Sequence, residues 1–572
     1  ANTQAFTHVL SVTYDVGYGE NDPPQSMTRR LRTVEYTLGG SSDTTSRTSG
    51  TVTYAGTSWN TSVATAGARN VVLSGSNIRV VHAYVDTVAQ PTTATNVTAQ
   101  LVALQVASSS NPRDLVRVGQ ISGTFWAQSG NTEYLHFVHD ATALFNEQND
   151  ADWSAGVPVT GMFSVTGPAT VLRTMKLVIT YEYDHDPDPH TEVKTIRFPL
   201  TSTTTADLGT ISSCASAATC TFVATTTMPD LLASSTANIL DVYYDLSVQV
   251  DSATASTFSP MIRGGSAGPS FNWTDVIAGD TNIRAIFRPT VGGSDFLSNS
   301  TQYLDVTMGT VGGRLLSGEL VVTYKADTSS TRQMETVSYY LNQYTATLGT
   351  ARSNFATATV TISNASRRAA NVWYRINETS TSTSALTLYG RVGTSSEERS
   401  ATYSHTATNA RDGMTPMLIF DLSQDAGQIW NATTTLAGGV QYASTGPAVG
   451  VEAMITFEWD GTQGGTETKT VQFGAAVPGV IATASGWLNT PLSVVLPEKV
   501  TKTYRSVYLR TTVHHSQATS ITAGNVLIGV NGTSSPYAIT VAEAADTTSE
   551  AFGADYLHHD CRMYGYRFHV RV

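Results

Sequence analysis

Hydrophobic and polar residues alternate in short stretches along most of this chain. Runs rich in Val, Ile, Thr and Tyr, bounded by clusters of Gly, Ser, Asn and Asp, recur about every ten residues. Helical periodicity is nearly absent, and its best candidate is one or two turns over residues 140–146. The pattern predicts an all-β chain of antiparallel β-sandwiches, of jelly-roll or immunoglobulin-like type.

One two-part phrase occurs four times. Its first part is an apolar residue, Thr and an aromatic residue: Val12-Thr13-Tyr14, Ile179-Thr180-Tyr181, Val322-Thr323-Tyr324 and Ile455-Thr456-Phe457. Its second part, a short gap later, reads Thr33-Val34-Glu35-Tyr36, Thr195-Ile196-Arg197-Phe198, Thr336-Val337-Ser338-Tyr339 and Thr470-Val471-Gln472-Phe473. Successive phrases are about 130 to 170 residues apart, the size of an independent domain.

This spacing predicts four tandem β-sandwich units related by internal duplication. The expected units are residues 19–184, 185–327 and 328–460, followed by a shortened fourth unit, 461–572, and preceded by an extra strand within 1–18. A second echo supports duplication, because Thr166-Gly167-Pro168-Ala169 returns as Thr445-Gly446-Pro447-Ala448.

The fourth unit lacks a segment that the other three have. In one alignment Asp555-Tyr556-Leu557-His558 matches Glu133-Tyr134-Leu135-His136, and the unit then stops before its closing strand. In the other, Tyr566-Arg567-Phe568 forms the closing strand and an internal strand is missing.

The extra strand at the beginning of the chain has the first part of the phrase, which in the other copies lies on the last strand of a unit, but no unit precedes it. The fourth unit, which lacks a strand, would expose unpaired backbone N–H and C=O groups. We expect the extra strand to be a donor strand for the fourth unit of a neighbouring copy, with the candidate donor residues Phe6, Val9, Leu10, Val12 and Tyr14. Head-to-tail donation of this kind builds a filament, and it resembles the architecture of prokaryotic surface filaments assembled by donor strands. The alternative is that the strand pairs with its own first domain and that the fourth unit is a small cap.

Composition narrows the classes of partner. Charged residues are only 14% of the chain and the formal net charge is -12. Because nucleic-acid binding needs clustered Lys and Arg, we expect no nucleic-acid partner. No apolar run is long enough to span a bilayer. The chain starts at Ala1, so we expect a removed leader and an extracellular or cell-surface location.

Cysteines and sequons fit an exported protein. Cys214 and Cys220 form a candidate disulfide that leaves Cys561 over, and the alternative is three unpaired thiols. The candidate N-glycosylation sites are Asn60, Asn96, Asn272, Asn299, Asn364, Asn377, Asn431 and Asn531.

Two motifs suggest chemistry, and neither has a suitable context. Gly264-Gly265-Ser266-Ala267-Gly268 matches a hydrolase nucleophile motif, but that motif works on a strand-to-helix turn. Asp184, His185, Asp186, Asp188 and His190 could bind a metal, yet Pro187 and Pro189 favour an extended segment. The sequence therefore assigns no catalytic residue, cofactor or metal.

The leading hypothesis is an exported structural glycoprotein that polymerises with copies of itself by strand donation. The alternatives are a monomeric adhesin or carbohydrate-binding protein, and a viral capsid or spike protein built of jelly rolls. An extracellular hydrolase ranks last.

Overall fold

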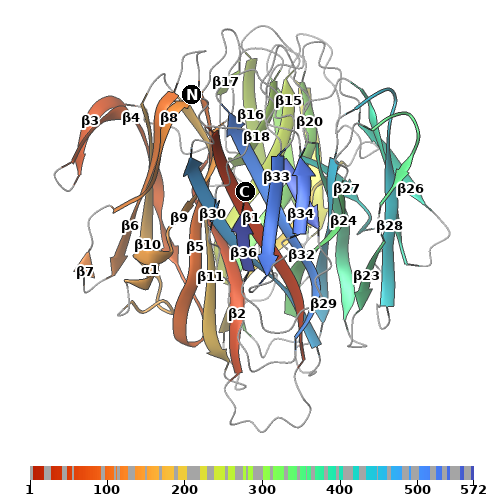
Figure 1. Cartoon of the computed structure of the whole chain (residues 1–572), viewed down its shortest axis with the longest axis horizontal. Helices are drawn as coiled ribbons and strands as arrows, with labels where there is room; N and C mark the ends of the chain where they lie inside the picture. The colour runs from red at the N-terminus through yellow and green to blue at the C-terminus, as the bar shows by residue number, and fades with distance from the viewer. Residues whose placement is uncertain are drawn as a thin grey trace. The chain divides into compact units, whose positions relative to one another are not determined.

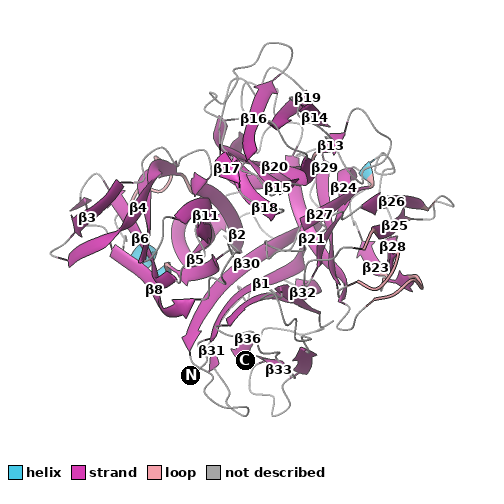
Figure 2. Ribbon diagram, turned by 90° about the horizontal axis from the view of Figure 1, so that it is seen from above, coloured by secondary structure: helices cyan, strands magenta, loops and turns pink. Residues whose placement is uncertain are grey.

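Strands make up nearly all of the chain that the computed structural model describes. The described residues are 4–17, 28–40, 48–54, 57–91, 97–108, 111–112, 116–125, 135–147, 151–166, 170–185, 191–202, 220–227, 238–250, 256–264, 275–277, 281–287, 301–308, 313–327, 333–343, 348–355, 357–361, 367–378, 384–393, 398–403, 417–423, 433–446, 449–459, 466–479, 489–490, 502–515, 524–530, 537–541, 554–558 and 568–571. Within them the one α-helix is α1, Thr142–Asn146, as the sequence predicted. Strands dominate the described chain (Figure 2). The all-β class and its antiparallel sheets are confirmed.

Four four-stranded sheets, most of whose strands are labelled in Figure 1, each have a strand with the first part of the repeated phrase in second place. Sheet 1 is β2 (Thr28–Gly40), β11 (Thr170–His185), β5 (Ser76–Pro91) and β9 (Leu135–Asp140). Sheet 2 is β12 (Thr191–Pro199), β20 (Gly313–Asp327), β15 (Asn238–Val250) and β18 (Thr281–Phe287). Sheet 3 is β21 (Gln333–Gln343), β29 (Val449–Trp459), β24 (Arg368–Glu378) and β27 (Met417–Asp421). Sheet 4 is β30 (Thr466–Gly479), β1 (Gln4–Gly17), β32 (Lys502–His515) and β35 (Ala554–His558).

The second strand of each sheet carries the first part of the repeated phrase. We call β1, β11, β20 and β29 the closing strands, and we call β2, β12, β21 and β30, which carry the second part, the edge strands. In sheets 1 to 3 the closing strand comes last in the chain among its sheet's strands. In sheet 4 it comes first, and β1 lies between β30 and β32. One chain thus fills by itself the position that the sequence assigned to a strand from a neighbour.

Four further sheets contain the remaining described strands. One is β3 (Thr48–Tyr54), β4 (Thr57–Val71), β10 (Val157–Thr166), β6 (Val97–Ser108) and β7 (Asn111–Pro112), with β8 (Val116–Phe125) paired to β6. The next is β13 (Thr201–Ser202), β14 (Cys220–Thr227), β19 (Thr301–Met308), β16 (Ser256–Gly264) and β17 (Asp275–Ile277). The third is β22 (Ser353–Asn354), β28 (Thr433–Tyr442), β25 (Leu386–Val392) and β26 (Arg399–Tyr403), with β23 (Ala358–Thr361) paired to β28. The last is β31 (Asn489–Thr490), β36 (Phe568–Arg571), β33 (Gly524–Val530) and β34 (Tyr537–Val541).

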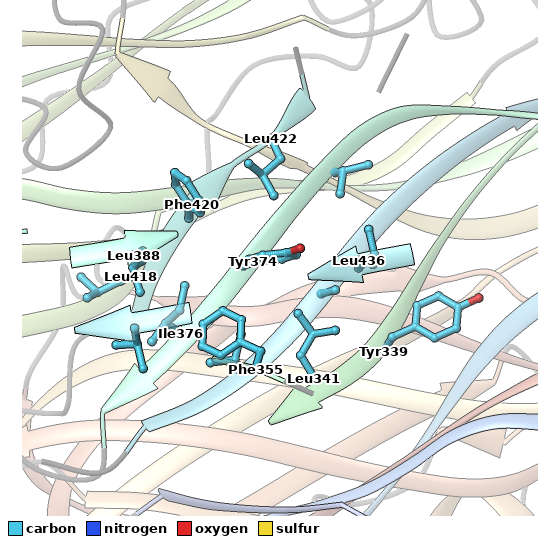
Figure 3. Packing of buried hydrophobic residues seen from close by; sticks show 14 of the residues in the cluster. Tyr339, Leu341, Phe355, Tyr374, Ile376, Leu388, Leu418, Phe420, Leu422 and Leu436 are labelled. Carbon is cyan, nitrogen blue, oxygen red and sulfur yellow. The ribbon is translucent and has the colours of Figure 1, made fainter. Parts of the chain in front are cut away.

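A sandwich core is best seen between sheet 3 and the sheet that contains β25 and β28. Tyr339 and Tyr374 of sheet 3 pack in one buried cluster with Leu388 and Leu436 of the opposite sheet (Figure 3). Each fully buried side chain of this size contributes about 1.5–3 kcal/mol of hydrophobic free energy. Alternation in the sequence therefore produces the sandwich that it predicts.

The closing strand β29 departs from simple alternation, because both of its faces are buried. Every residue of this strand is buried except the last, Trp459. On the face opposite the sandwich core, Met454 packs with Trp373, Met417 and Ile419. A strand that is covered on both faces does not show the alternation of buried apolar and exposed polar residues that a half-exposed strand has.

The chain consists of two compact units. Unit 1 comprises residues 1–12, 25–186 and 471–572, and unit 2 comprises 13–24 and 187–470. The strands β1 and β30 each contribute residues to both units. The predicted boundaries between four domains stay a prediction.

Candidate functional site: the strands that hold β1

The predicted donor strand β1 is buried on both faces where its side chains are described. Leu10, Val12 and Tyr14 alternate with Ser11 and Thr13, and all five are buried. Val9 is buried as well, and Phe6 lies in β1 without a described side chain. A strand without one exposed face must satisfy its polar side chains as well as its apolar ones.

In unit 2, Thr13 takes part in a closed ring of three hydrogen bonds. The Ser338 N–H donates to Thr470 Oγ1 at 3.0 Å, Thr13 Oγ1 lies 2.7 Å from Thr470 Oγ1, and Thr13 Oγ1 donates to the Ser338 carbonyl at 2.6 Å. Because the Thr13 hydrogen goes to the carbonyl, the Thr470 hydroxyl must donate to Thr13. Each group donates once and accepts once, so the bonds polarise one another in the same direction.

The same hydroxyl ring, as we call it, occurs in sheets 1 and 3. Gln472 N–H donates to Thr33 at 3.0 Å, Thr33 lies 2.7 Å from Thr180, and Thr180 donates to the Gln472 carbonyl at 2.6 Å, all within unit 1.

In unit 2, Arg197 N–H donates to Thr336 at 2.9 Å, Thr336 lies 3.0 Å from Thr456, and Thr456 donates to the Arg197 carbonyl at 2.6 Å. The fourth threonine pair, Thr195 and Thr323, has its hydroxyls 2.8 Å apart. The Thr33–Thr180 ring and the Thr336–Thr456 ring thus have the same three hydrogen bonds as the Thr13 ring.

These rings satisfy the open sides of edge strands. Ser338, Arg197 and Gln472 lie on β21, β12 and β30, each two residues beyond the phrase threonine of its own strand. An edge strand exposes N–H and C=O groups that no neighbouring strand pairs. The threonine pair of one sheet supplies a donor and an acceptor to the backbone of one residue in another sheet. The repeated Thr of the phrase is therefore a contact between sheets.

Two further contacts hold β1 and β30 in place. Thr468 Oγ1 donates to an Asp15 carboxylate oxygen at 2.7 Å, next to the Thr13 ring in unit 2. In unit 1, Val9 packs with Tyr84, Val138 and Val178 of sheet 1. The contacts of Val9, Thr13 and Asp15 thus lie on one face of β1, and Leu10, Val12 and Tyr14 are buried on the other.

A histidine of sheet 1 meets the same open side of β30. His82 Nε2 lies 2.9 Å from the Gly474 nitrogen and 2.6 Å from the Gly474 carbonyl oxygen, and His82 Nδ1 lies 3.2 Å from Thr142 Oγ1. One ring nitrogen can accept from the N–H or donate to the carbonyl, so its protonation decides which bond forms. Burial lowers the pKa of His82, against the opposing effects of Asp140 and the Gly474 carbonyl.

Unit 2 contains a buried charge cluster between sheets 2 and 3. Glu319 of β20 is 0% exposed and lies 3.1 Å from Arg197 Nη1 and 2.7 Å from Arg375 Nη2. Trp373 Nε1 donates to the same carboxylate at 2.8 Å, and Arg375 Nη1 lies 3.3 Å from Glu452. Burial alone raises the pKa of Glu319, but Arg375 and Arg197 outweigh it and hold the pKa below its ordinary value.

The structure places few of the other residues singled out in the sequence. Asn377 lies on β24 with 4% exposure, so a glycan on this side chain is incompatible with the packed strand. Asn60 lies on β4 and Cys220 on β14, and their side chains are outside the described part. Six sequons and two cysteines are also outside it: Asn96, Asn272, Asn299, Asn364, Asn431, Asn531, Cys214 and Cys561.

The Asp184 carboxylate has protein partners. Asn77 Nδ2 donates to it at 2.6 Å and Arg29 Nη1 lies 3.2 Å away. The other residues of that cluster, except His185 at the end of β11, are outside the described ranges. Among the described residues, no group of three or more His, Cys, Asp and Glu side chains could hold a metal ion. The same part of the chain has no helix that is long and apolar enough to cross a membrane.

Sequence reasoning missed the role of the threonines and of the buried charges. The fourfold return of Thr at both positions of the phrase was a signal, because an apolar core would not require a hydroxyl there. Nothing in the sequence marks Glu319 and Arg375 as partners, since they lie on different sheets.

Comparisons with known proteins leave the family open. No protein-family model matches the chain, and no curated protein sequence matches it. The major capsid protein P2 of bacteriophage PM2 is similar over 47% of this chain and 99% of its own, with 8% identity and a TM-score of 0.17. The glycanase PNGase F is similar over 48% and 99%, with 9% identity and a TM-score of 0.17. The VP2 subviral particle of infectious bursal disease virus is similar over 78% and 84%, with 11% identity and a TM-score of 0.14. Likenesses this low carry no argument about this chain.

Proposed function

We propose that this chain is an exported structural glycoprotein, built of four duplicated β-sandwich repeats, that assembles with copies of itself by exchange of β1. The observation that carries the proposal is the place of β1 in sheet 4, where it takes the position held by β11, β20 and β29 in the other sheets. A strand from a neighbouring copy would find the same partners there.

The energetic argument is the low cost of exchanging identical strands. Removal of β1 would expose the backbone of β30 and β32 together with the apolar partners of Leu10, Val12 and Tyr14. The position must therefore be filled, but the contacts are the same whether the strand comes from the same chain or from a neighbour. One-way donation from copy to copy does not close on itself and gives a filament, whereas mutual exchange gives a closed dimer.

A designed disulfide tests the proposal. Asp15 and Thr468 face each other, with side-chain oxygens 2.7 Å apart, so cysteines at both positions would have their sulfur atoms within bonding reach. We expect the double variant Asp15→Cys with Thr468→Cys, oxidised under assembling conditions, to form a covalent ladder on non-reducing gels. Negative-stain electron microscopy of the same sample should show fibres.

The controls are the two variants with one added cysteine each. Like the double variant they keep Cys214, Cys220 and Cys561, so cross-links through the native cysteines would appear in them too, and the ladder should be absent. Complete cross-linking within single chains, together with monomers in the micrographs, would contradict exchange between copies. A monomer would instead favour the adhesin or carbohydrate-binding alternative.

A further inference from the structure

The apolar pattern of β1 does not by itself fix the register of this strand. Leu10, Val12 and Tyr14 are all apolar and lie two residues apart, so a two-residue shift that brings Val16 to the place of Tyr14 keeps an apolar side chain at each position of that face. The opposite shift keeps apolar residues at the places of Val12 and Tyr14 but brings His8 to the place of Leu10. Some other feature must select one register.

The hydroxyl ring distinguishes these registers. A shift that brings Asp15 opposite Thr470 would place a carboxylate, which only accepts, against the Ser338 carbonyl. The opposite shift would bring Ser11 to the ring, but Val12 would then replace the larger Tyr14 and leave its site underfilled. In the observed register the ring is closed and the Asp15 carboxylate accepts from Thr468.

All four closing strands present the same three residue types at this place. Each has an apolar β-branched residue, Thr and an aromatic residue in succession. Three of the four threonines donate to a backbone carbonyl of another sheet at 2.6 Å: Thr13, Thr180 and Thr456. The hydroxyl is thus the constant polar feature of strands that occupy this position.

We infer that the Thr13 hydroxyl is the group by which sheet 4 selects its closing strand and sets its register. The strand it accepts is an extended segment with an apolar, a hydroxyl and an aromatic side chain in succession, and the β1 of a second copy qualifies. The partner in this inference rests on the proposed function, while the selection by Thr13 applies to whichever copy supplies the strand.

Hydrogen exchange of the full chain, followed by mass spectrometry of the peptide that covers residues 4–17, tests this selection. Thr13→Val keeps the shape and removes the hydroxyl, which leaves the buried Ser338 carbonyl without this donor. We expect exchange in β1 to become at least about tenfold faster. Thr13→Ser retains the hydroxyl and should stay within about threefold of the parent.

The matched control is Thr456→Val, because Thr456 is as buried as Thr13 and belongs to a ring that does not include β1 or β30. It should accelerate exchange in β29 and leave β1 near the parent rate. Equal acceleration of β1 by both valine variants would overturn the inference, as would no acceleration by Thr13→Val. If Thr13→Val does not fold, Thr470→Val removes the same ring from the partner strand and has the same expected result.

The two tests fail independently. If the double-cysteine variant cross-links only within single chains and Thr13→Val still accelerates hydrogen exchange in β1, exchange between copies is refuted and the selection by Thr13 is kept. A chain that forms ladders while Thr13→Val exchanges at the parent rate would keep the proposed assembly and refute the selection.

Discussion

At the residue scale, buried imidazoles make unit 1 sensitive to acid. His139 of β9 is almost fully buried, and burial lowers its pKa to about 4. Burial also lowers the pKa of His82, whose ring nitrogen meets Gly474 of β30. Both groups are therefore neutral in the folded chain at neutral pH and gain protons more readily when it unfolds.

The sign of the pH dependence follows from this difference. Below the ordinary histidine pKa of about 6.5, the unfolded chain binds the proton and the folded chain does not, so stability falls as the pH decreases towards 4. For His139 alone, the free energy of unfolding falls by about 2 kcal/mol between pH 7 and pH 5. The free energy of unfolding of His139→Leu, measured with urea at the two pH values, should therefore fall by about 2 kcal/mol less than that of the parent chain. Equal losses in the two proteins would contradict the assignment.

At the element scale, close approach of strands depends on a glycine of β30. A Cβ added to Gly474 would lie 2.6 Å from Tyr84 Cγ and 2.7 Å from Val138 Cγ1, both on the face of sheet 1 that packs against Val9. These contacts are too short for real carbon atoms, so the strand or the aromatic ring would have to move.

Gly474→Ala is therefore expected to destabilise unit 1 by about 1–3 kcal/mol, the usual cost of an overpacked site. Gly349→Ala is the control, because nothing lies within 4 Å of its added Cβ. Thermal unfolding of the two variants should separate them clearly. A Gly474→Ala chain as stable as the control would show that the β30 contact is loose.

At this scale the sequence predicted strands better than it predicted their neighbours. Alternation and the repeated phrase located the strands and marked β1 as a copy of a closing strand. They did not show that both faces of β29 are buried, because burial of the second face depends on strands that are distant in the sequence, through Trp373 of β24 and Met417 of β27. For the same reason the rings could not be derived, since Thr456 and Arg197 are brought together only by packing of sheets 2 and 3.

At the scale of the whole molecule, the four sheets are not interchangeable, and charge distinguishes them. The position that Glu319 holds in β20 is held by Glu452 in β29 and by Lys176 in β11, where Lys176 pairs with Asp86 at 3.5 Å. Arg375 of sheet 3 pairs with Glu452 of its own sheet and with Glu319 of sheet 2, so the charges of the two sheets are complementary. A sheet with another charge pattern would leave these groups buried and uncompensated.

Removal of one charge from this cluster should be costly. Glu319→Gln removes the carboxylate that Arg197 and Arg375 share, while Arg375 keeps its contact with Glu452. We expect a loss of about 3–5 kcal/mol in the free energy of unfolding of unit 2. Glu398→Gln, which breaks a half-exposed ion pair with Arg352, should cost less than about 1 kcal/mol. Chemical denaturation distinguishes the two, and similar values would contradict a structural role for the cluster.

The place of β1 in sheet 4 also sets the order of events during synthesis. The ribosome makes β1 before any other described strand, yet its two neighbours in the sheet, β30 and β32, begin only at Thr466 and Lys502. At the usual rate of about 5–20 residues per second, β1 waits roughly half a minute or longer for a partner. During that time its apolar residues are available to chaperones and to the β30 and β32 strands of copies completed earlier, so the choice between self-closure and exchange begins before the chain is complete.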